Sequence, residues 1–332
     1  MAKKPERSGV NENVAIVDGF VDQDYLQLIE AAWAKVGGYA REILPQFEGQ
    51  DSTDKTIVRA LDWLREATLR KESPSFFADP KKAETTSLEV AREAYPGFLN
   101  GETTGTNLLF SGDGLEIWRD YYKSSNALYA PLNEIPAVAL AKRVKEGVPF
   151  RVLEVGAGTG GATSVALQTI EQVATSPVNY IVTDISVRLL RSTAERLNKN
   201  TSTLIKTEFE RFNLNAEPIG KLVAAKEFDV VIAVNALHNV QDLPATLKML
   251  STLLKKGGVL LISESLCGAE EQVHQEFFLN LLPQPEHRSD KSSRFLTSDE
   301  WQNAVRNAGL KAEIGINTSG PELVLLATVS KR

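Results

Sequence analysis

The chain has 332 residues, of which 42% are hydrophobic and 24% charged, a balance that is ordinary for a folded protein and excludes extensive disorder. Its 43 acidic and 37 basic side chains give a formal net charge of −6, which argues against partners such as nucleic acid or a membrane surface. A single cysteine, Cys267, excludes an intrachain disulfide and a cysteine-based metal cluster, and fits a reducing cytoplasm.

The N-terminal third is predicted to be helical. The polar stretch Met1–Asn13 lacks the apolar segment of a signal peptide, and no apolar run in the chain is long enough to cross a membrane. From Asp22 to Lys71, and again around 116–122 and 136–144, apolar residues recur at helical spacing. Pro74, Pro80 and Pro96, in the stretch after Lys71, are expected to interrupt the helices.

After Pro149 short β-branched runs alternate with longer helical ones, which predicts βαβ units and a mostly parallel sheet. The last two strands have only a short turn between them and should pair as an antiparallel hairpin at the sheet edge. The predicted strands are 151–155, 179–184, 205–209, 229–234, 258–263, 311–316 and 322–330. The predicted helices between them are 162–173, 186–198, 242–254 and 298–308.

This order predicts an α/β, Rossmann-like sheet of five parallel strands plus a C-terminal antiparallel hairpin. The length exceeds what one core usually organises, so an accessory part is expected. We expect residues 1–135 to form a helical lid or substrate subdomain and residues 136–332 to form the nucleotide-binding core. A lid-like insertion is expected at about 266–297.

The strongest local signal is the glycine-rich sequence LEVGAGTGG at 153–161, which directly follows a predicted strand and directly precedes a predicted helix. Glycines allow a sharp turn and a close approach of a ligand to the backbone, and the helix N-terminus favours negative charge. Gly156, Gly158 and Gly161 also fit the dinucleotide spacing, so the motif alone suits a nicotinamide cofactor or another adenosine derivative.

Three features favour an adenosine derivative other than a nicotinamide cofactor. Glu154 precedes the glycines, where an acid would repel a pyrophosphate but suits a cationic cofactor with an amino-acid tail. Asp184 ends the second predicted strand, where a carboxylate can accept hydrogen bonds from ribose hydroxyls. A terminal hairpin replaces the second half of a dinucleotide fold. Together these features resemble the class I S-adenosylmethionine-dependent methyltransferases.

The resemblance implies a cofactor pocket for S-adenosyl-L-methionine. Asp184 would hold the ribose, Ile185 would pack on the adenine, and Asn235 would lie beside the sulfonium. Asn213 stands where similar enzymes have an acidic residue at the adenine amino group. The full set implied to bind the cofactor is Glu154, Gly156, Ala157, Gly158, Gly160, Asp184, Ile185, Asn213 and Asn235.

A candidate general base follows the fourth strand. His238 lies at or just past its carboxyl end, which is the edge where open α/β sheets bind ligands, and Glu264 ends the adjacent strand. A carboxylate beside an imidazole fixes its tautomer and stabilises its protonated form. The alternative is a packing or capping histidine. His274 and His287 are expected to be solvated or structural, and no metal site is predicted.

The resemblance narrows to the C-methyltransferase domains of polyketide synthases and related hybrid synthetases, over roughly 96–330. The segments that carry it are Gly105–Gly112, Asp120–Ser125, Asn133, Leu153–Gly161, Asn235–His238, Glu264 and Arg294–Trp301. It implies that a dyad of His238 and Glu264 removes the α-proton of a β-ketoacyl thioester on an acyl carrier protein. Tyr121, Tyr122, Tyr129 and Asn133 would orient the acyl carbonyl from the lid side, or simply pack the helices.

Two alternatives stay open. One is an O-methyltransferase, or a C-methyltransferase acting on a free keto acid or phenol in secondary metabolism; the other is a silent binding module of the same fold. Such domains usually lie within large synthases, so we expect this chain to be either an excised domain or a free-standing, trans-acting enzyme of the cytoplasm. The start at Met1 favours the free-standing enzyme. Arg65, Arg70 and Lys71 are expected to form a solvated face rather than a docking patch.

Overall fold

A computed structural model gives the structure of the chain. It describes residues 12–21, 23–69, 83–110, 114–123, 125–144, 147–197, 203–216, 227–267, 273–288, 291, 293–315 and 324–330. Two of the three basic residues considered above, Arg70 and Lys71, fall outside the described residues, as do Pro74 and Pro80. The third, Arg65, lies 2.5 Å from Asp62 in an exposed ion pair.

The N-terminal part is helical over its described residues. Asp54 begins one of its helices by accepting a hydrogen bond from the backbone N–H of Thr56 at 2.7 Å. The expected interruption at Pro96 is wrong, because Pro96 lies inside a helix where the neighbouring Tyr95 and Leu99 are fully buried. The elements are α1 (Glu12–Asp18), α2 (Gln23–Ile43), the 3-10 helix η1 (Leu44–Phe47), α3 (Lys55–Thr68), α4 (Ala83–Leu99), α5 (Gly105–Phe110), α6 (Gly114–Tyr121) and α7 (Ala130–Ala141).

The C-terminal part is a seven-stranded sheet in the order β3-β2-β1-β4-β5-β7-β6. Strands β1 to β5 run parallel, while β7 pairs antiparallel with both β5 and β6, which confirms the predicted sheet and its terminal hairpin. The strands are β1 (Phe150–Val155), β2 (Val178–Asp184), β3 (Ile205–Arg211), β4 (Phe228–Val234), β5 (Leu254–Ser265), β6 (Lys311–Gly315) and β7 (Val324–Ser330). The helices and 3-10 turns between them are α8 (Gly161–Val173), α9 (Val187–Leu197), η2 (Leu237–Asn239), α11 (Leu243–Thr252), α12 (Val273–Leu279), η4 (Glu286–Arg288) and α13 (Ser298–Asn307).

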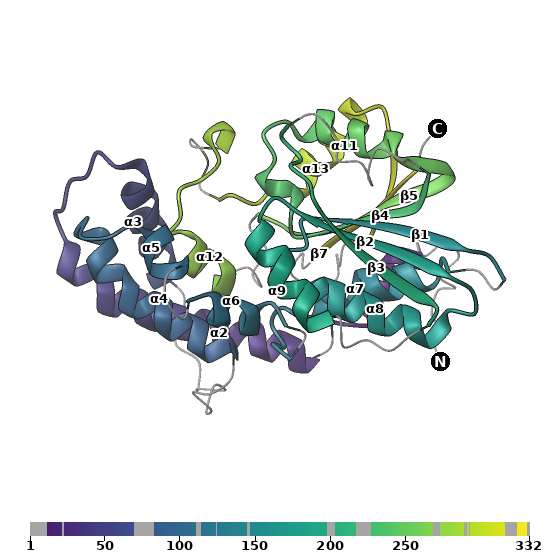
Figure 1. Cartoon of the computed structure of the whole chain (residues 1–332). Coiled ribbons are helices and arrows are strands. Elements are labelled where there is room, and N and C mark those ends of the chain that lie inside the picture. Colours follow the sequence, from purple (N-terminus) through teal and green to yellow (C-terminus); the bar gives the residue numbers. More distant parts are fainter. Residues whose placement is uncertain are drawn as a thin grey trace, which may run out of the picture.

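The two faces of the sheet belong to different cores. Alternate residues of one strand point to opposite faces, so Val152 of β1 joins one apolar cluster and Leu153 joins the other. The cluster around Leu153 packs under α11 and α13. The cluster around Val152 continues without a break through α7 and α8 into the helical N-terminal part (Figure 1).

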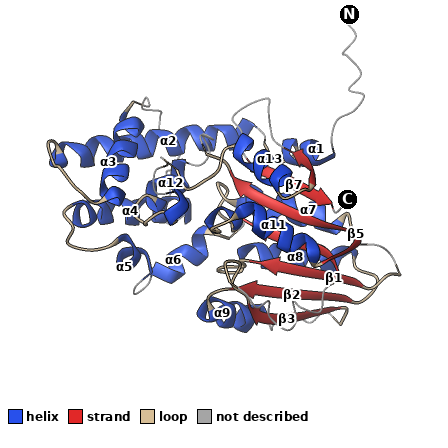
Figure 2. Cartoon of the chain, turned by 90° about the horizontal axis from the view of Figure 1, so that it is seen from above, coloured by secondary structure: helices blue, strands red, loops and turns tan. Residues whose placement is uncertain are grey.

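The insertion after β5 returns to the helical part, where α12 contacts α2 and α4 (Figure 2). Trp63 of α3 donates a hydrogen bond from Nε1 to Glu276 Oε2 at 2.8 Å. Arg59 of α3 donates from Nη2 to the carbonyl oxygen of Leu282 at 2.7 Å. Conversely, α1 contacts β6 and β7, and residue 135 falls inside α7, so the two parts interlock at the predicted boundary. Among the helices described, none is both long and apolar enough to cross a membrane.

Candidate active site

The glycine turn after β1 forms one wall of a cavity of about 390 Å³, which we call the glycine-turn cavity. The N-terminus of α9 forms a second wall, and aromatic side chains from the helical part close it. Seven predicted site residues line it: Tyr122, Tyr129, Asn133, Gly156, Ala157, Gly158 and Asn235. The other described lining residues are Trp118, Thr159, Gly161, Ala162, Ser186, Arg188, Leu189, Val234 and Leu279.

Two glycines of the turn have no space for a side chain. Gly156 has a φ of +71°, and a Cβ there would lie 2.6 Å from the Cβ of Ala236 in the turn after β4. A Cβ on Gly161 would lie 2.1 Å from the carbonyl oxygen of Tyr122. The turn is therefore pressed against the β4 edge on one side and against the helical part on the other.

Asp184, at the end of β2, holds the turn in place. Its Oδ2 accepts a hydrogen bond from the backbone N–H of Gly158 at 2.8 Å, and its Oδ1 accepts one from Ser186 N–H at 2.7 Å. The carboxylate thus joins the glycine turn to the start of α9. The next side chain, Ile185, is 53% exposed, which leaves an apolar surface open beside this carboxylate.

Glu154 lies beneath the turn and is only 2% exposed. Its carboxylate accepts hydrogen bonds from Thr163 Oγ1 at 3.0 Å and from the Tyr180 hydroxyl at 2.9 Å. Burial raises the pKa of Glu154 to about 7, and the two hydrogen bonds oppose that rise only partly. Glu154 therefore supports the turn from below and is not among the described residues that line the cavity.

Asp184 and Ile185 also lie off the described lining of this cavity, and so do three further predicted residues. Asn213 follows β3 and uses its Oδ1 to accept a hydrogen bond from the backbone N–H of Asn215 at 3.0 Å. Gly160 has a φ of +77° and faces the Thr193 side chain. Tyr121 is fully buried, and its ring packs 4.7 Å, centroid to centroid, from that of Phe278.

His238 and Glu264 form the predicted pair. The Nδ1 atom of His238 lies 2.8 Å from Glu264 Oε2, and both side chains are buried, at 4% and 0% exposure. The second carboxylate oxygen, Oε1, accepts hydrogen bonds from the backbone N–H groups of Ala236 and Leu237 at 2.8 and 2.6 Å. Glu264 therefore fixes both the imidazole and the turn that carries it.

The other ring nitrogen of His238 lies 2.8 Å from Nδ2 of Asn239. An amide nitrogen only donates, so Nε2 of His238 accepts and the ring proton lies on Nδ1, where it is donated to Glu264. This tautomer leaves the lone pair of a potential base on Nε2. Asn239 follows His238 directly in the sequence, but no spacing rule singled it out.

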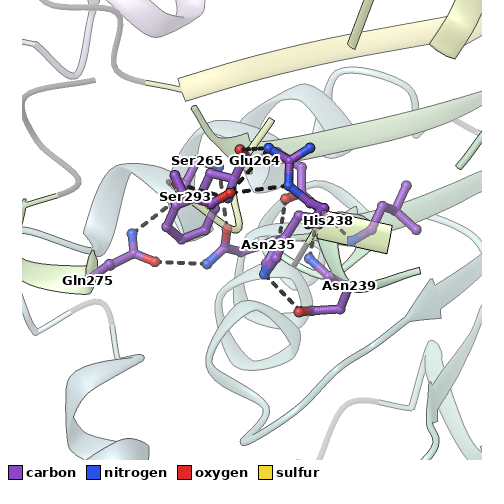
Figure 3. A network of polar contacts seen from close by, with 11 residues as sticks. Asn235, His238, Asn239, Glu264, Ser265, Gln275 and Ser293 are labelled. Carbon is purple, nitrogen blue, oxygen red and sulfur yellow. Dashed lines mark hydrogen bonds and ion pairs between the residues drawn. The ribbon is translucent and has the colours of Figure 1, made fainter. Parts of the chain in front are cut away.

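A polar network connects this pair to the insertion helix α12 (Figure 3). Asn235 has a φ of +49° and donates from Nδ2 to Oε1 of Gln275 at 3.0 Å. Gln275 is fully buried and donates from Nε2 to the Ser265 hydroxyl at 3.0 Å. Ser265 directly follows Glu264 in β5. The side chain of Gln275 therefore joins Asn235, in the cavity wall, to the strand that carries Glu264.

A second cavity, of about 380 Å³, lies beyond His238, and we call it the α13 cavity. Its walls come from η2, the start of α11, η4 and one face of α13. The described lining residues are Leu237, His238, Val240, Gln241, Asp242, Leu243, Pro244, His287, Arg288, Leu296, Glu300, Asn303, Ala304 and Asn307.

The other two histidines have different surroundings, one buried and one exposed. His274 is 1% exposed, and its ring centroid lies 5.7 Å from that of Tyr121, so it is structural rather than solvated. His287 is exposed on η4 and lines the α13 cavity. Partial burial, with Arg288 nearby, holds the pKa of His287 below its ordinary value. Within the described ranges, no three His, Cys, Asp or Glu side chains are grouped so as to hold a metal ion.

A protein-family model described as a methyltransferase domain matches residues 122–313. The chain is 30% identical over 189 residues to polyketide synthase PksR of Bacillus subtilis (strain 168). It is 32% identical over 186 residues to the citrinin polyketide synthase of Monascus purpureus. Each match covers 55% of this chain but 7% of the relative, so the chain spans a small part of these large proteins.

Solved structures match both parts of the chain. The citrinin polyketide synthase CMeT domain superposes with a TM-score of 0.74 at 20% identity, covering 96% of this chain and 95% of that one. The trans-methyltransferase CalH, in complex with SAH, gives 0.65 at 19% identity over 94% of this chain and 93% of that one. At these identities the likeness confirms the fold, a class I methyltransferase sheet with an N-terminal helical part.

Proposed function

The chain belongs to the methyltransferase domain family, with S-adenosylmethionine as methyl donor, and we propose that it methylates the α-carbon of a β-ketoacyl thioester carried by an acyl carrier protein. The sequence relatives named above are polyketide synthases, and one structural neighbour is a trans-methyltransferase. We place the reaction in polyketide-type secondary metabolism.

The lining of the glycine-turn cavity fits a cationic adenosine derivative. Trp118 and Tyr122 are stacked with ring centroids 5.6 Å apart, and Tyr129 lies edge-on to Tyr122 at 4.8 Å. Aromatic faces attract a cation such as a sulfonium. We assign the ribose to Asp184, the adenine to the exposed side chain of Ile185, and the sulfonium side to Asn235 and these rings. Bound there, S-adenosylmethionine would supply a methyl group from its positively charged sulfur. The sulfur would be left as a neutral thioether after transfer of the methyl group to a carbon nucleophile.

The observation that carries carbon methylation is the buried pair of His238 and Glu264. Nε2 of His238 removes the α-proton of the acceptor, and the electron pair of the C–H bond forms the enolate that bonds to the methyl carbon. Glu264 stabilises the imidazolium through Nδ1–H, and the proton then passes from Nε2 to solvent. A positioned base contributes roughly 10² to 10⁴ in rate, which a weakly acidic carbon requires.

We propose that the two parts of the chain have different roles in this reaction. Residues 1–135 supply aromatic cover for the methyl donor, and residues 136–332 supply the donor site and the base. Within the cover, Tyr122, Tyr129 and Asn133 line the cavity and are assigned to the acyl carbonyl. Tyr121 is assigned to packing, because it is fully buried.

The test is to incubate the enzyme with methyl-labelled S-adenosylmethionine and, separately, a β-ketoacyl carrier protein, a free β-keto acid and a phenol. We expect label on the α-carbon of the carrier-bound acyl group, located by mass spectrometry after release from the carrier. Label only on the free acid, or on oxygen, would refute the thioester assignment in favour of a small-molecule methyltransferase.

A further inference from the structure

His238 lies between two cavities, and they differ in their access to the base. His238 lines the α13 cavity, whereas the described lining of the glycine-turn cavity reaches only as far as Asn235 in the same turn. A general base must lie within hydrogen-bond reach of the proton that it removes. His238 is 4% exposed and lines the α13 cavity, so this cavity offers a route of approach to the imidazole.

The sizes of the two cavities are consistent with one occupant each. A site for one small ligand measures roughly 300 to 1,000 Å³, and the glycine-turn cavity, at about 390 Å³, is at the lower end of that range. The methyl donor fills such a space, so an acceptor with a long arm needs another one. The α13 cavity provides about 380 Å³ directly beside the base.

The charged side chains that line the α13 cavity bond within the protein. Asp242 accepts a hydrogen bond from Ala245 N–H at 2.9 Å as the N-cap of α11. Arg288 donates to Glu300 Oε1 at 3.3 Å and to the carbonyl oxygen of Phe295 at 2.7 Å. These contacts compensate the charges, so the cavity suits a neutral ligand rather than an ionic one.

Carboxamides and apolar groups form the rest of the wall. Asn303 and Asn307 are four residues apart on α13, so both lie on one face of the helix, and both are exposed. The apolar side chains of Leu243, Pro244 and Leu296 also line the cavity. The Oδ1 atom of Asn303 accepts from Arg306 Nη2 at 2.6 Å, so Asn303 can offer its Nδ2 as a donor to an amide carbonyl of a ligand.

From these features we infer that the α13 cavity binds the neutral, amide-containing arm of a pantetheine-type acyl thioester, with Asn303 and Asn307 pairing with its amides and the acyl end at His238. This inference rests on the proposed function. It assigns only the arm to a site separate from that of the methyl donor, with entry along α13. The acyl carbonyl, beyond His238, is still assigned to Tyr122, Tyr129 and Asn133 of the glycine-turn cavity.

The test uses Asn303→Trp, which places a large ring in the cavity from an exposed position. Gln302→Trp is the matched control, because Gln302 is exposed on the same helix but is not among the described lining residues. The probes are a β-ketoacyl pantetheine thioester and the shorter N-acetylcysteamine thioester of the same acyl group. Asn307→Trp repeats the test one helical turn further along.

We expect Asn303→Trp to raise KM for the pantetheine thioester about tenfold, with a smaller rise for the shorter thioester. The Kd for S-adenosylmethionine should stay within about twofold of wild type, and Gln302→Trp should match wild type in both measurements. An unchanged KM in both asparagine variants, or an equal rise in the Gln302 control, overturns the inference while leaving the proposed function intact. Failure of the wild-type enzyme to methylate either thioester instead overturns the proposed function, and this inference with it.

Discussion

The two cavities lie on either side of the same short turn, residues 235–238, yet they are built from different parts of the chain. The glycine-turn cavity takes its walls from both parts of the chain, including Trp118 of α6 and Leu279 of α12. The described lining of the α13 cavity comes from residues 237–307 alone. The proposed donor site therefore depends on how the helical part packs on the sheet, whereas the proposed base and its access depend on the sheet and its own loops.

The largest effect should come from removing the base. His238→Ala should lower kcat by roughly 10² to 10⁴, because it removes the proposed acceptor of the α-proton, while the Kd for S-adenosylmethionine stays within a few-fold. Single-turnover methylation and calorimetric binding measure the two quantities. His287→Ala, in the same cavity but exposed, is the control. Loss of donor binding in His238→Ala would show that the two cavities do not work separately.

Glu154, beneath the glycine-turn cavity, should make the stability of the protein depend on pH. Glu154 has a folded pKa of about 7 against an ordinary 4.5. The folded state thus binds the proton more tightly, and this contribution to stability is complete below about pH 4.5 and is lost as the pH rises to about 7. At about 1.4 kcal/mol for each pKa unit, the loss amounts to roughly 3–4 kcal/mol.

Glu154→Gln removes that titration. Urea unfolding without the cofactor should show the variant gaining free energy of unfolding, relative to wild type, between pH 5 and pH 8. The exposed Glu286→Gln serves as the control. If the difference in unfolding free energy between wild type and Glu154→Gln does not change with pH, the raised pKa of this buried carboxyl group is contradicted.

Gly161→Ala tests whether the donor cavity needs close contact between the two parts of the chain. The new Cβ would meet the Tyr122 carbonyl oxygen at 2.1 Å, so the backbone has to move. We expect a loss of about 1–3 kcal/mol in unfolding free energy and a weaker Kd for S-adenosylmethionine. Gly38→Ala, inside α2 with nothing within 4 Å, should instead stabilise the protein slightly. Equal behaviour of the two variants would argue against this contact.

The smallest expected effect is that of Gln275→Leu, which disconnects α12 from Asn235 and Ser265. The substitution removes the hydrogen bonds that Gln275 makes with both residues. If the transition state loses about 1.4 kcal/mol of stabilisation, kcat falls about tenfold. Gln302→Leu on the exposed face of α13 is the control. If kcat and the pH profile of Gln275→Leu equal those of wild type, Gln275 only packs α12.

The sheet could be predicted because its signals are local. The β-branched runs and the helical spacing after Pro149 placed every predicted strand within four residues of its observed start. Pro96 was misjudged because burial of its neighbours outweighs the loss of one backbone hydrogen bond. The pairing of His238 with Glu264 was also predictable, since adjacent parallel strands end side by side.

The rest of the site could not be predicted for a physical reason. Trp118, Leu279 and Gln275 reach it through packing between segments far apart in the chain, which no spacing encodes. The residue type of Asn213 did not reveal that its Oδ1 accepts from the backbone N–H of Asn215, nor that it lies off the described lining of the cavity. The sequence thus predicted the glycine turn and the pairing of His238 with Glu264, but not the contacts between the two parts that complete the cavity.

The interlocking of the two parts has a consequence for anyone who recombines such enzymes. Glu276 and Phe277 of α12 bond to Trp63 and Tyr95, whose helices come from the other end of the chain. A graft of residues 1–135 alone would separate Trp63 and Tyr95 from their own α12. It would also cut α7 near its middle. A transferable unit has to carry two separate stretches, about residues 12–141 and 273–294, and we expect only such paired exchanges to yield folded chimeras.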